Sequence, residues 1–127
     1  MAGVKRPYFL TDSVTLTASG TGELTLRPGA NERFEGHKIS FVKGGTFSIT
    51  GIKNDSGTPY TNADSEDPIT STMLPTVITD FHNPIELAAP LVIEKNDALT
   101  FQLTDTSAAS NTVRVMIEGT MESLETK

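Results

Sequence analysis

The stretch from Leu99 to Gly119 reads LTFQLTDTSAASNTVRVMIEG and contains the clearest pattern of the chain. Apolar residues occupy every second position in both of its halves, from Leu99 to Leu103 and from Val113 to Ile117. Such alternation predicts two strands that each turn one face to a core and the other to solvent. The polar residues between the halves are typical of a turn. We therefore expect two antiparallel strands joined here.

Short runs with the same period of two recur along most of the chain. Turn residues such as Gly, Asn and Pro separate them, and the Lys43-Gly44-Gly45 turn is expected to join two strands as a short hairpin. A new strand is expected about every 10–15 residues, which is typical of a sandwich or a small barrel. The apolar members of these runs form the predicted core: Val14, Leu16, Leu24, Leu26, Ile39, Phe41, Phe47, Ile49, Leu99, Phe101, Leu103, Val113, Val115 and Ile117.

Length and composition indicate one all-β domain. The chain has 127 residues, which suits a single hydrophobic core. Threonine occurs nineteen times, and this β-branched residue favours strands. No stretch shows a convincing helical period. We therefore predict a single domain over residues 1–127, an antiparallel β-sandwich that is jelly-roll-like and has about eight strands.

The net charge of −6 is distributed unevenly along the chain. Residues 1–53 carry seven Lys or Arg and four Asp or Glu, whereas residues 54–127 carry three and twelve. An acidic chain binds nucleic acid poorly, because that binding depends on neutralising phosphates. No apolar run reaches the length of a membrane span. We expect no nucleic-acid and no membrane partner, and the two charged halves either mix on the surface or steer contacts between proteins.

Few residues suggest catalysis, a metal or a cofactor. Cysteine is absent, which excludes disulfides, thiolate metal sites and a cysteine nucleophile. The two histidines, His37 and His82, lie in no metal-ligand spacing, and the serine-nucleophile motif GxSxG does not occur. Tyr8 and Tyr60 are the only plausible sugar-stacking residues, which makes a thin platform for a carbohydrate. We therefore expect no enzymatic activity, no cofactor and no metal ligand set.

One long polar segment interrupts the strand pattern. Residues 54–72 are rich in turn-forming residues and are predicted to be a long acidic loop. Connections longer than about 12–15 residues are often functional. The residues that follow, 74–90, are expected to cross from one sheet to the other as a Greek-key connection. Calcium binding by the loop stays open, although the EF-hand pattern is missing, and its candidate ligands are Asp55, Asp64, Glu66 and Asp67.

The order of several motifs resembles that of a known class of proteins. The motifs are Pro7–Thr11, Val14–Leu16, Gly44–Ile49, Phe81–Ile85, Leu99–Ser107 and Asn111–Gly119. They resemble the small β-sandwich virion proteins of tailed bacteriophages, especially accessory head or decoration proteins. In those proteins an Asn/Asp-Thr-Ser turn precedes a valine-rich strand that closes on a glycine. The resemblance implies no catalytic residues, a homo-oligomer, and protein partners such as the major capsid protein or another virion protein.

These observations predict a non-enzymatic structural protein of the virion, made in the host cytoplasm, that decorates and stabilises the capsid. The alternative is a carbohydrate- or receptor-binding module of a fibre or tail. Residues 1–8 are predicted to contact another chain as an arm or exchanged strand, because Pro7 suits an edge strand or a segment that leaves the sheet. The competing expectation for Phe9 is burial in its own sandwich. The predicted interface residues are Lys5, Arg6, Pro7, Tyr8, Phe9 and Tyr60.

Overall fold

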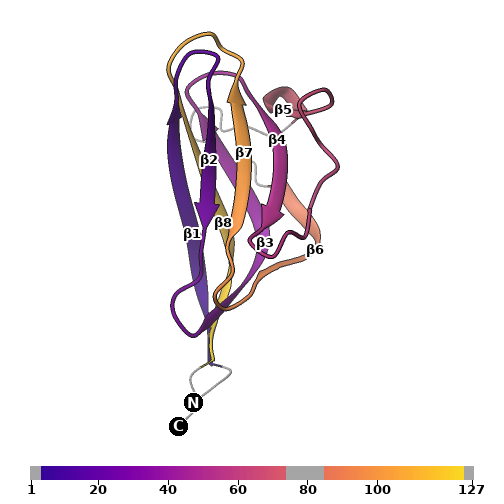
Figure 1. Ribbon diagram of the computed structural model, residues 1–127. Coiled ribbons are helices and arrows are strands. Elements are labelled where there is room, and N and C mark those ends of the chain that lie inside the picture. Colours follow the sequence, from indigo (N-terminus) through magenta and orange to yellow (C-terminus); the bar gives the residue numbers. More distant parts are fainter. Residues whose placement is uncertain (1–3, 74–84, 125–127) are drawn as a thin grey trace.

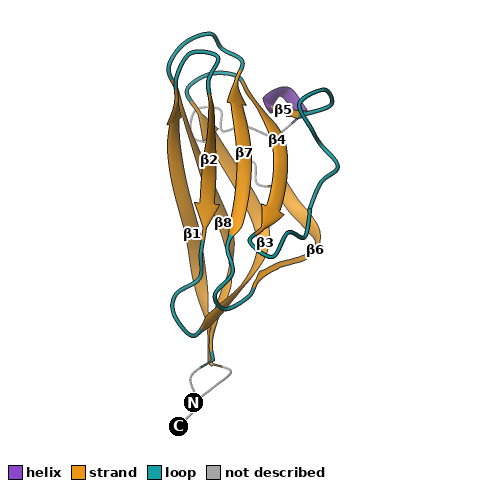
Figure 2. Cartoon of the chain, viewed as in Figure 1, coloured by secondary structure: helices purple, strands orange, loops and turns teal. Residues whose placement is uncertain are grey.

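The computed structural model describes residues 4–73 and 85–124 of the chain. The regular secondary structure of this part consists of strands and one short 3₁₀ turn, joined by loops (Figure 2). It contains no helix long and apolar enough to span a membrane. The elements are β1 (Val4–Leu16), β2 (Thr21–Leu26), β3 (Glu32–Lys43), β4 (Phe47–Asn54), β5 (Ile69–Thr70), the 3₁₀ turn η1 (Ser71–Met73), β6 (Ile85–Ile93), β7 (Leu99–Asp105) and β8 (Asn111–Ser123).

The strands form two antiparallel sheets that pack face to face (Figure 1). One sheet has the order β1-β8-β3-β6 and the other β2-β7-β4-β5. This is the strand order of a jelly roll, in which two Greek keys are folded into a sandwich. The predicted all-β, jelly-roll-like sandwich of eight strands is therefore confirmed.

The prediction that strands consecutive in the sequence pair as hairpins is wrong at two turns. β3 and β4, and likewise β7 and β8, do not pair with each other but lie in different sheets. The Gly44-Gly45 turn and the turn after Asp105 therefore cross from one sheet to the other at the upper end of Figure 1. The physical reason is that long strands of a jelly roll pair with partners distant in sequence, so β8 fits between β1 and β3.

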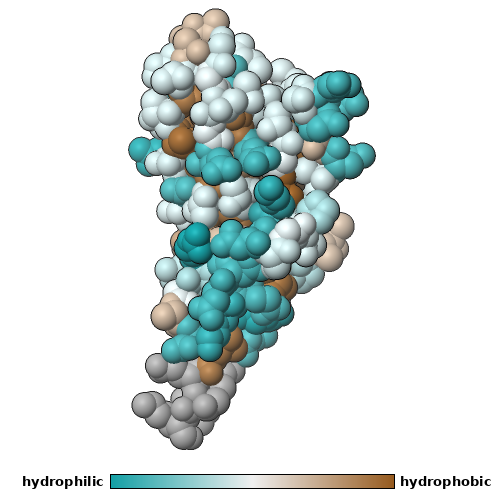
Figure 3. All heavy atoms as spheres, viewed as in Figure 1, coloured by the Kyte–Doolittle hydropathy of each residue, from teal (hydrophilic) through white to brown (hydrophobic). Residues whose placement is uncertain are grey.

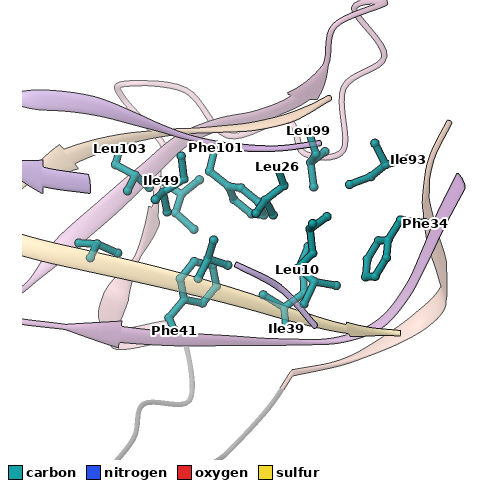
Figure 4. Packing of buried hydrophobic residues seen from close by; sticks show 14 of the residues in the cluster. Leu10, Leu26, Phe34, Ile39, Phe41, Ile49, Ile93, Leu99, Phe101 and Leu103 are labelled. Atoms are coloured by element: carbon teal, nitrogen blue, oxygen red, sulfur yellow. The ribbon is translucent and has the colours of Figure 1, made fainter. Parts of the chain in front are cut away.

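The core lies between the two sheets (Figure 4). Every predicted core residue is buried except Val14, which is half-buried and packs against the core. Phe101 of β7 and Phe41 of β3 meet edge to face across the sandwich, with ring centroids 5.9 Å apart. The structure adds buried residues that the alternation did not identify: Leu10, Phe34, Ile93, Ala98 and Met121.

A bulge in β3 explains one of these omissions. The register of β3 shifts between Gly36 and Lys38, so His37 is an extra residue that changes the phase of the alternation. Phe34 and Ile39 both reach the core although their spacing is odd. A bulge of this kind places one residue more on one strand than on its neighbour.

Gly119 lies where β3 and β8 approach each other most closely. It pairs with Gly36, and a Cβ atom built on Gly119 would overlap the carbonyl oxygen of Glu35. That overlap is with backbone, which cannot move aside as a flexible side chain can. β8 therefore continues through this glycine to Ser123 and places Met121 in the core.

Gly119→Ala is expected to destabilise the protein by roughly 1–3 kcal/mol, because the methyl group forces the two strands apart. Thermal unfolding followed by circular dichroism measures the effect. Gly44→Ala is the matched control, since a Cβ there meets nothing nearer than 3.4 Å. Equal melting temperatures for Gly119→Ala and the unaltered protein would show that β3 and β8 tolerate a side chain at this point.

The predicted long loop is interrupted near its end. Residues 69–70 form β5, which pairs with Ser48 and Ile49 of β4, and η1 follows directly. The Ser71 hydroxyl accepts a hydrogen bond from the backbone N–H of Phe47, which fixes this end of the loop to the sheet. The predicted crossing over 74–90 lies partly outside the described residues, as does His82; from Ile85 onward the chain is strand β6.

Candidate interaction surface

The predicted N-terminal interface residues lie in an edge strand. β1 starts at Val4 and pairs along its whole length with β8, beginning with Val4 opposite Ser123. From Val4 onward, the segment predicted to be an arm is therefore an integral strand of the sheet. Its first three residues, 1–3, are outside the described residues. Of the two arrangements that suit Pro7, an edge strand and a segment that leaves the sheet, the structure shows the first: β1 is an edge strand.

Tyr8 and Phe9 point to opposite faces of the sheet. Tyr8 is half-buried and packs against the core, with its ring 6.3 Å from that of Phe34 in an edge-to-face arrangement. Phe9 is 60% exposed on the outer face. The expectation that Phe9 would be buried in its own sandwich is therefore wrong, because Phe9 has the opposite phase to Leu10, which is in the core.

The two basic residues of this segment differ in their partners. The guanidinium of Arg6 lies 2.8 Å from the carboxylate of Glu32 and 5.2 Å from the centre of the Tyr8 ring. Arg6 is thus already paired within the chain. Lys5 is exposed. Charge at this end of β1 is consequently less available to a partner than the sequence suggested.

Tyr60 lies apart from the β1 residues. Its backbone N–H donates to the carbonyl of Ile52 in β4, a strand of the other sheet, and its side chain is 40% exposed. β1 and β4 occupy different parts of the sandwich in Figure 1. The structure therefore brings Lys5, Arg6, Pro7, Tyr8 and Phe9 together along one strand but does not bring Tyr60 to them.

An apolar diagonal crosses the outer face of β1, β8 and β3. Because β8 pairs with β1 on one side and β3 on the other, residues of the three strands form rows. Phe9, Met116 and Val42 occupy three successive rows, one on each strand. Phe9 and Val42 are exposed and Met116 is half-buried. Diagonal neighbours are within reach of large side chains, and exposed apolar side chains that gather on one face mark interaction sites.

A groove of about 460 Å³ lies beside this diagonal. The row Thr11–Met116–Ser40 and the row Ser13–Arg114–Val42 both contribute to its lining. We call the groove and the diagonal together the outer patch. Its residues are Phe9, Thr11, Ser13, Ser40, Val42, Arg114 and Met116.

Arg114 is the cation of the outer patch. Its side chain is exposed, and its neighbours in the row are Ser13 and Val42, neither of which carries a charge. It makes no ion pair with any residue in the described ranges. A cation next to an apolar groove favours a partner that brings a carboxylate. No pattern in the sequence distinguishes Arg114 from other surface cations.

The outer face of the second sheet is polar. Figure 3 shows that the surface over β2, β7 and β4 is mainly hydrophilic or neutral, with apolar atoms scattered over it. A smaller hollow of about 370 Å³ on this face is lined in part by Glu23, Thr50 and Gln102. The two faces of the sandwich thus offer surfaces of different chemistry.

The acidic loop uses several of its carboxylates within the chain. Asp64 accepts hydrogen bonds from the backbone N–H groups of Glu66 and Asp67, and Asp55 lies 3.5 Å from the guanidinium of Arg27. No three His, Asp or Glu side chains of residues 4–73 and 85–124 gather as a metal site would require. His37 lies at the bulge, 3.5 Å from Glu35. The calcium alternative therefore finds no support in this part of the chain.

A buried polar cluster ties together the turns at the upper end. Asp105 and Asn111 are 3% and 0% exposed. The Asp105 carboxylate accepts hydrogen bonds from the Ser107 hydroxyl at 2.6 Å, from the backbone N–H of Ser19 at 2.8 Å and from the Asn111 amide at 3.1 Å. The cluster joins the β1–β2 turn to the β7–β8 turn, so it positions the upper ends of the strands that carry the outer patch.

Hydrogen bonds hold Asp105 ionised. The Ser107 hydroxyl lowers its pKa most, burial opposes this, and the N–H groups of Ser19 and Ser107 together with the Asn111 amide add to the lowering, so the pKa lies far below its ordinary value. A lowered pKa stabilises the fold fully above the unfolded-state pKa of about 3.9, and this stabilisation is lost as the pH falls below that value.

The free energy of unfolding is therefore expected to decrease as the pH falls from about 5 towards 2, with the uptake of about one proton by Asp105 on unfolding. Urea unfolding at several pH values measures the slope. Asp105→Asn should be less stable at neutral pH. Its unfolding in acid should take up about one proton fewer than that of the unaltered chain, so its stability should depend less steeply on pH. Ser107→Ala raises the folded-state pKa of Asp105 towards its unfolded value, so the loss of stability in acid should become smaller and should be complete at a higher pH. An unchanged slope in Asp105→Asn would show that other carboxylates cause the acid sensitivity.

Comparisons with protein-family models, with curated proteins and with solved structures found no match for this chain.

Proposed function

We propose that the chain is a non-enzymatic structural protein of a virus particle, an accessory protein that binds the lattice of the major capsid protein as a homo-oligomer and stabilises the shell. The observation that carries this proposal is the outer patch, an apolar diagonal with a groove on a sheet of long strands. Jelly rolls recur in viral capsid proteins, which favours the same class of function. The motif resemblance to phage head and decoration proteins points in the same direction.

A surface of this kind suits assembly for an energetic reason. Burial of Phe9 in a contact would contribute roughly 1.5–3 kcal/mol for that side chain alone. The patch lies on paired strands, so little backbone has to be ordered on binding, and that lowers the entropic cost of association. A stable contact with few residues is what a shell protein repeated in many copies requires.

Rebinding to particles tests the proposal. Particles are produced from a viral genome in which the gene for this chain is disrupted, and the purified chain is added back and sedimented with them. The chain is expected to pellet with the particles in a saturable manner and to raise the temperature at which they disrupt. Lys53→Glu, on the opposite sheet, should bind like the unaltered chain. A chain that stays in the supernatant at all concentrations contradicts the proposal.

The polar hollow favours a second candidate, a carbohydrate- or receptor-binding module of a fibre or tail. Glu23, Thr50 and Gln102 line it, and such groups form hydrogen bonds with sugar hydroxyls. Jelly rolls also occur among lectins. A glycan array separates the candidates: glycan binding that is lost in Gln102→Ala, without binding to particles, would replace the first proposal with the second.

A further inference from the structure

We infer that the outer patch binds an extended segment of the capsid protein by its side chains: a carboxylate that Arg114 holds with two hydrogen bonds, and an apolar side chain, two residues away, that packs on Met116. The inference rests on the proposed function and deepens it, because it states what the partner must present to this surface. The charge of Arg114, the course of the groove and the apolar residues beside it point to this kind of segment.

Arg114 differs from the other three arginines of the chain in its surroundings. Arg6, Arg27 and Arg33 each lie 3.5 Å or less from a carboxylate oxygen of the same chain. Arg114 is exposed and makes no ion pair within residues 4–73 and 85–124. A guanidinium presents a planar set of donors that fits a carboxylate with two parallel hydrogen bonds. Arg114 can therefore take a carboxylate from outside the chain.

The carboxylate in the lining of the groove is directed elsewhere. Asp12 belongs to this lining, but its carboxylate accepts a hydrogen bond at 2.8 Å from the backbone N–H of Thr25, on β2 of the other sheet. Asp12 also pairs with the buried Val115, in the core-facing phase of β1 and β8. It therefore does not offset the charge of Arg114 at the outer face.

A single cation favours a carboxylate over a nucleic acid. Of the described residues that form the outer patch, Arg114 alone is charged. Binding to a phosphate backbone depends on several cations together, and the net charge of −6 opposes it. The row neighbours Ser13 and Val42 carry no charge, so a carboxylate bound here lies against partly apolar surface. An ion pair in such a place is screened less by salt than one in open solvent.

The groove follows β8, and this sets the spacing within the segment. Its lining includes consecutive residues of β8, among them Arg114 and Met116, which lie on the same face roughly 7 Å apart at about 3.4 Å per residue. An extended segment along β8 has the same repeat, with every second side chain directed towards the sheet. A carboxylate over Arg114 thus places the side chain two residues away over Met116.

The surroundings of Met116 suit an apolar side chain. The exposed Phe9 and Val42 lie diagonally to either side of it, on β1 and β3. The groove volume of about 460 Å³ falls in the range of roughly 300–1,000 Å³ that is typical of binding pockets, so it accommodates a few side chains. The contact thus combines one ion pair with one apolar anchor.

Binding to particles that lack the chain tests the role of Arg114. Arg114→Ala is expected to bind at least about 10-fold more weakly, and Arg114→Glu at least about 30-fold, because the second variant brings two carboxylates together. Arg114→Lys keeps the charge but not the planar donors, so its affinity should lie between those of the unaltered chain and Arg114→Ala. Arg27→Glu is the matched charge reversal, at the end of β2 in the other sheet, and should bind like the unaltered chain.

A zero-length carbodiimide cross-linker identifies the carboxylate of the partner. In Arg114→Lys the introduced amine condenses with a carboxylate in contact with it, and mass spectrometry of the digested particles locates the joined residue. We expect an Asp or Glu of the major capsid protein that has an apolar residue two positions before or after it. Arg27→Lys, treated in the same way, is the control and should give no such link.

Thermal unfolding of every variant verifies that it is folded. Binding of Arg114→Glu at the affinity of the unaltered chain overturns the inference but leaves the proposed function intact. The inference also fails if Arg114→Lys binds without forming the cross-link, if the joined residue has no apolar residue two positions away, or if nuclease treatment abolishes binding. An unaltered chain that does not pellet with the particles removes the proposed function, and the inference with it.

Discussion

Phe101→Ala is expected to lower the free energy of unfolding by about 3–5 kcal/mol. Phe101 is 1% exposed and lies on β7, in the interior of its sheet, between Leu24 and Ile52 on the neighbouring strands. Its ring also meets that of Phe41 from the other sheet. Truncation removes contacts within one sheet and between the two, and leaves a cavity that the long paired strands cannot close.

Urea unfolding followed by far-ultraviolet circular dichroism measures this loss, since the chain contains no tryptophan for a fluorescence signal. Phe9→Ala is the matched control: the same substitution at an exposed position should change the stability by less than about 0.5 kcal/mol. Domains of this size have total stabilities of about 5–15 kcal/mol, so the loss would be a large fraction of the total. Similar losses in the two variants would show that Phe9 packs as a core residue.

Asn111→Ala is expected to lower the free energy of unfolding by about 2–4 kcal/mol. The Asn111 carbonyl oxygen accepts hydrogen bonds from the N–H groups of Gly44 and Gly45, and its amide donates to the Thr46 carbonyl and to Asp105. The Gly44 N–H and the Thr46 carbonyl keep backbone partners in the variant. The Gly45 N–H loses its side-chain acceptor, and Asp105 loses one of its donors, which sets the size of the effect.

Asn111→Asp distinguishes this account from a simple loss of volume. The new carboxylate retains the shape of the asparagine but faces the Asp105 carboxylate, so the variant should be less stable than Asn111→Ala at neutral pH and should recover in acid. Asn62→Ala, at an exposed position of the loop, is the control and should be nearly neutral. Equal stability of the Asn111→Ala and Asn62→Ala variants in urea would contradict the structural role of the cluster.

The strand pattern predicted most of the core because one physical signal, alternation, marks burial on one face of a strand. The alternation failed to identify core residues where a bulge shifts its phase or where a glycine inside a strand looks like the end of that strand. Phe34 was missed because the bulge at His37 disturbs the spacing to Ile39, and Met121 because Gly119 resembles the end of a strand. The partners of each strand could not be predicted, because alternation does not specify which strand lies beside which.

The candidate surface was only partly predictable for the same reason. The first nine residues include two adjacent aromatics, and the sequence alone did not show which one faces solvent. Pairing of β1 with β8 settles this: Tyr8 faces the core and Phe9 the outer face. Met116, Val42 and Arg114 join Phe9 only through strand register, which brings Phe9 and Met116 into neighbouring rows although they are far apart in the chain.

We propose that this jelly roll is a repeated component of a virus particle. Quantitative mass spectrometry of gradient-purified particles, with the chain and the major capsid protein measured together, tests it most directly. We predict that the chain co-purifies with intact particles in many copies and at a fixed ratio to the major capsid protein. Absence of the chain from purified particles, or its presence at a trace level that varies between preparations, would contradict the claim.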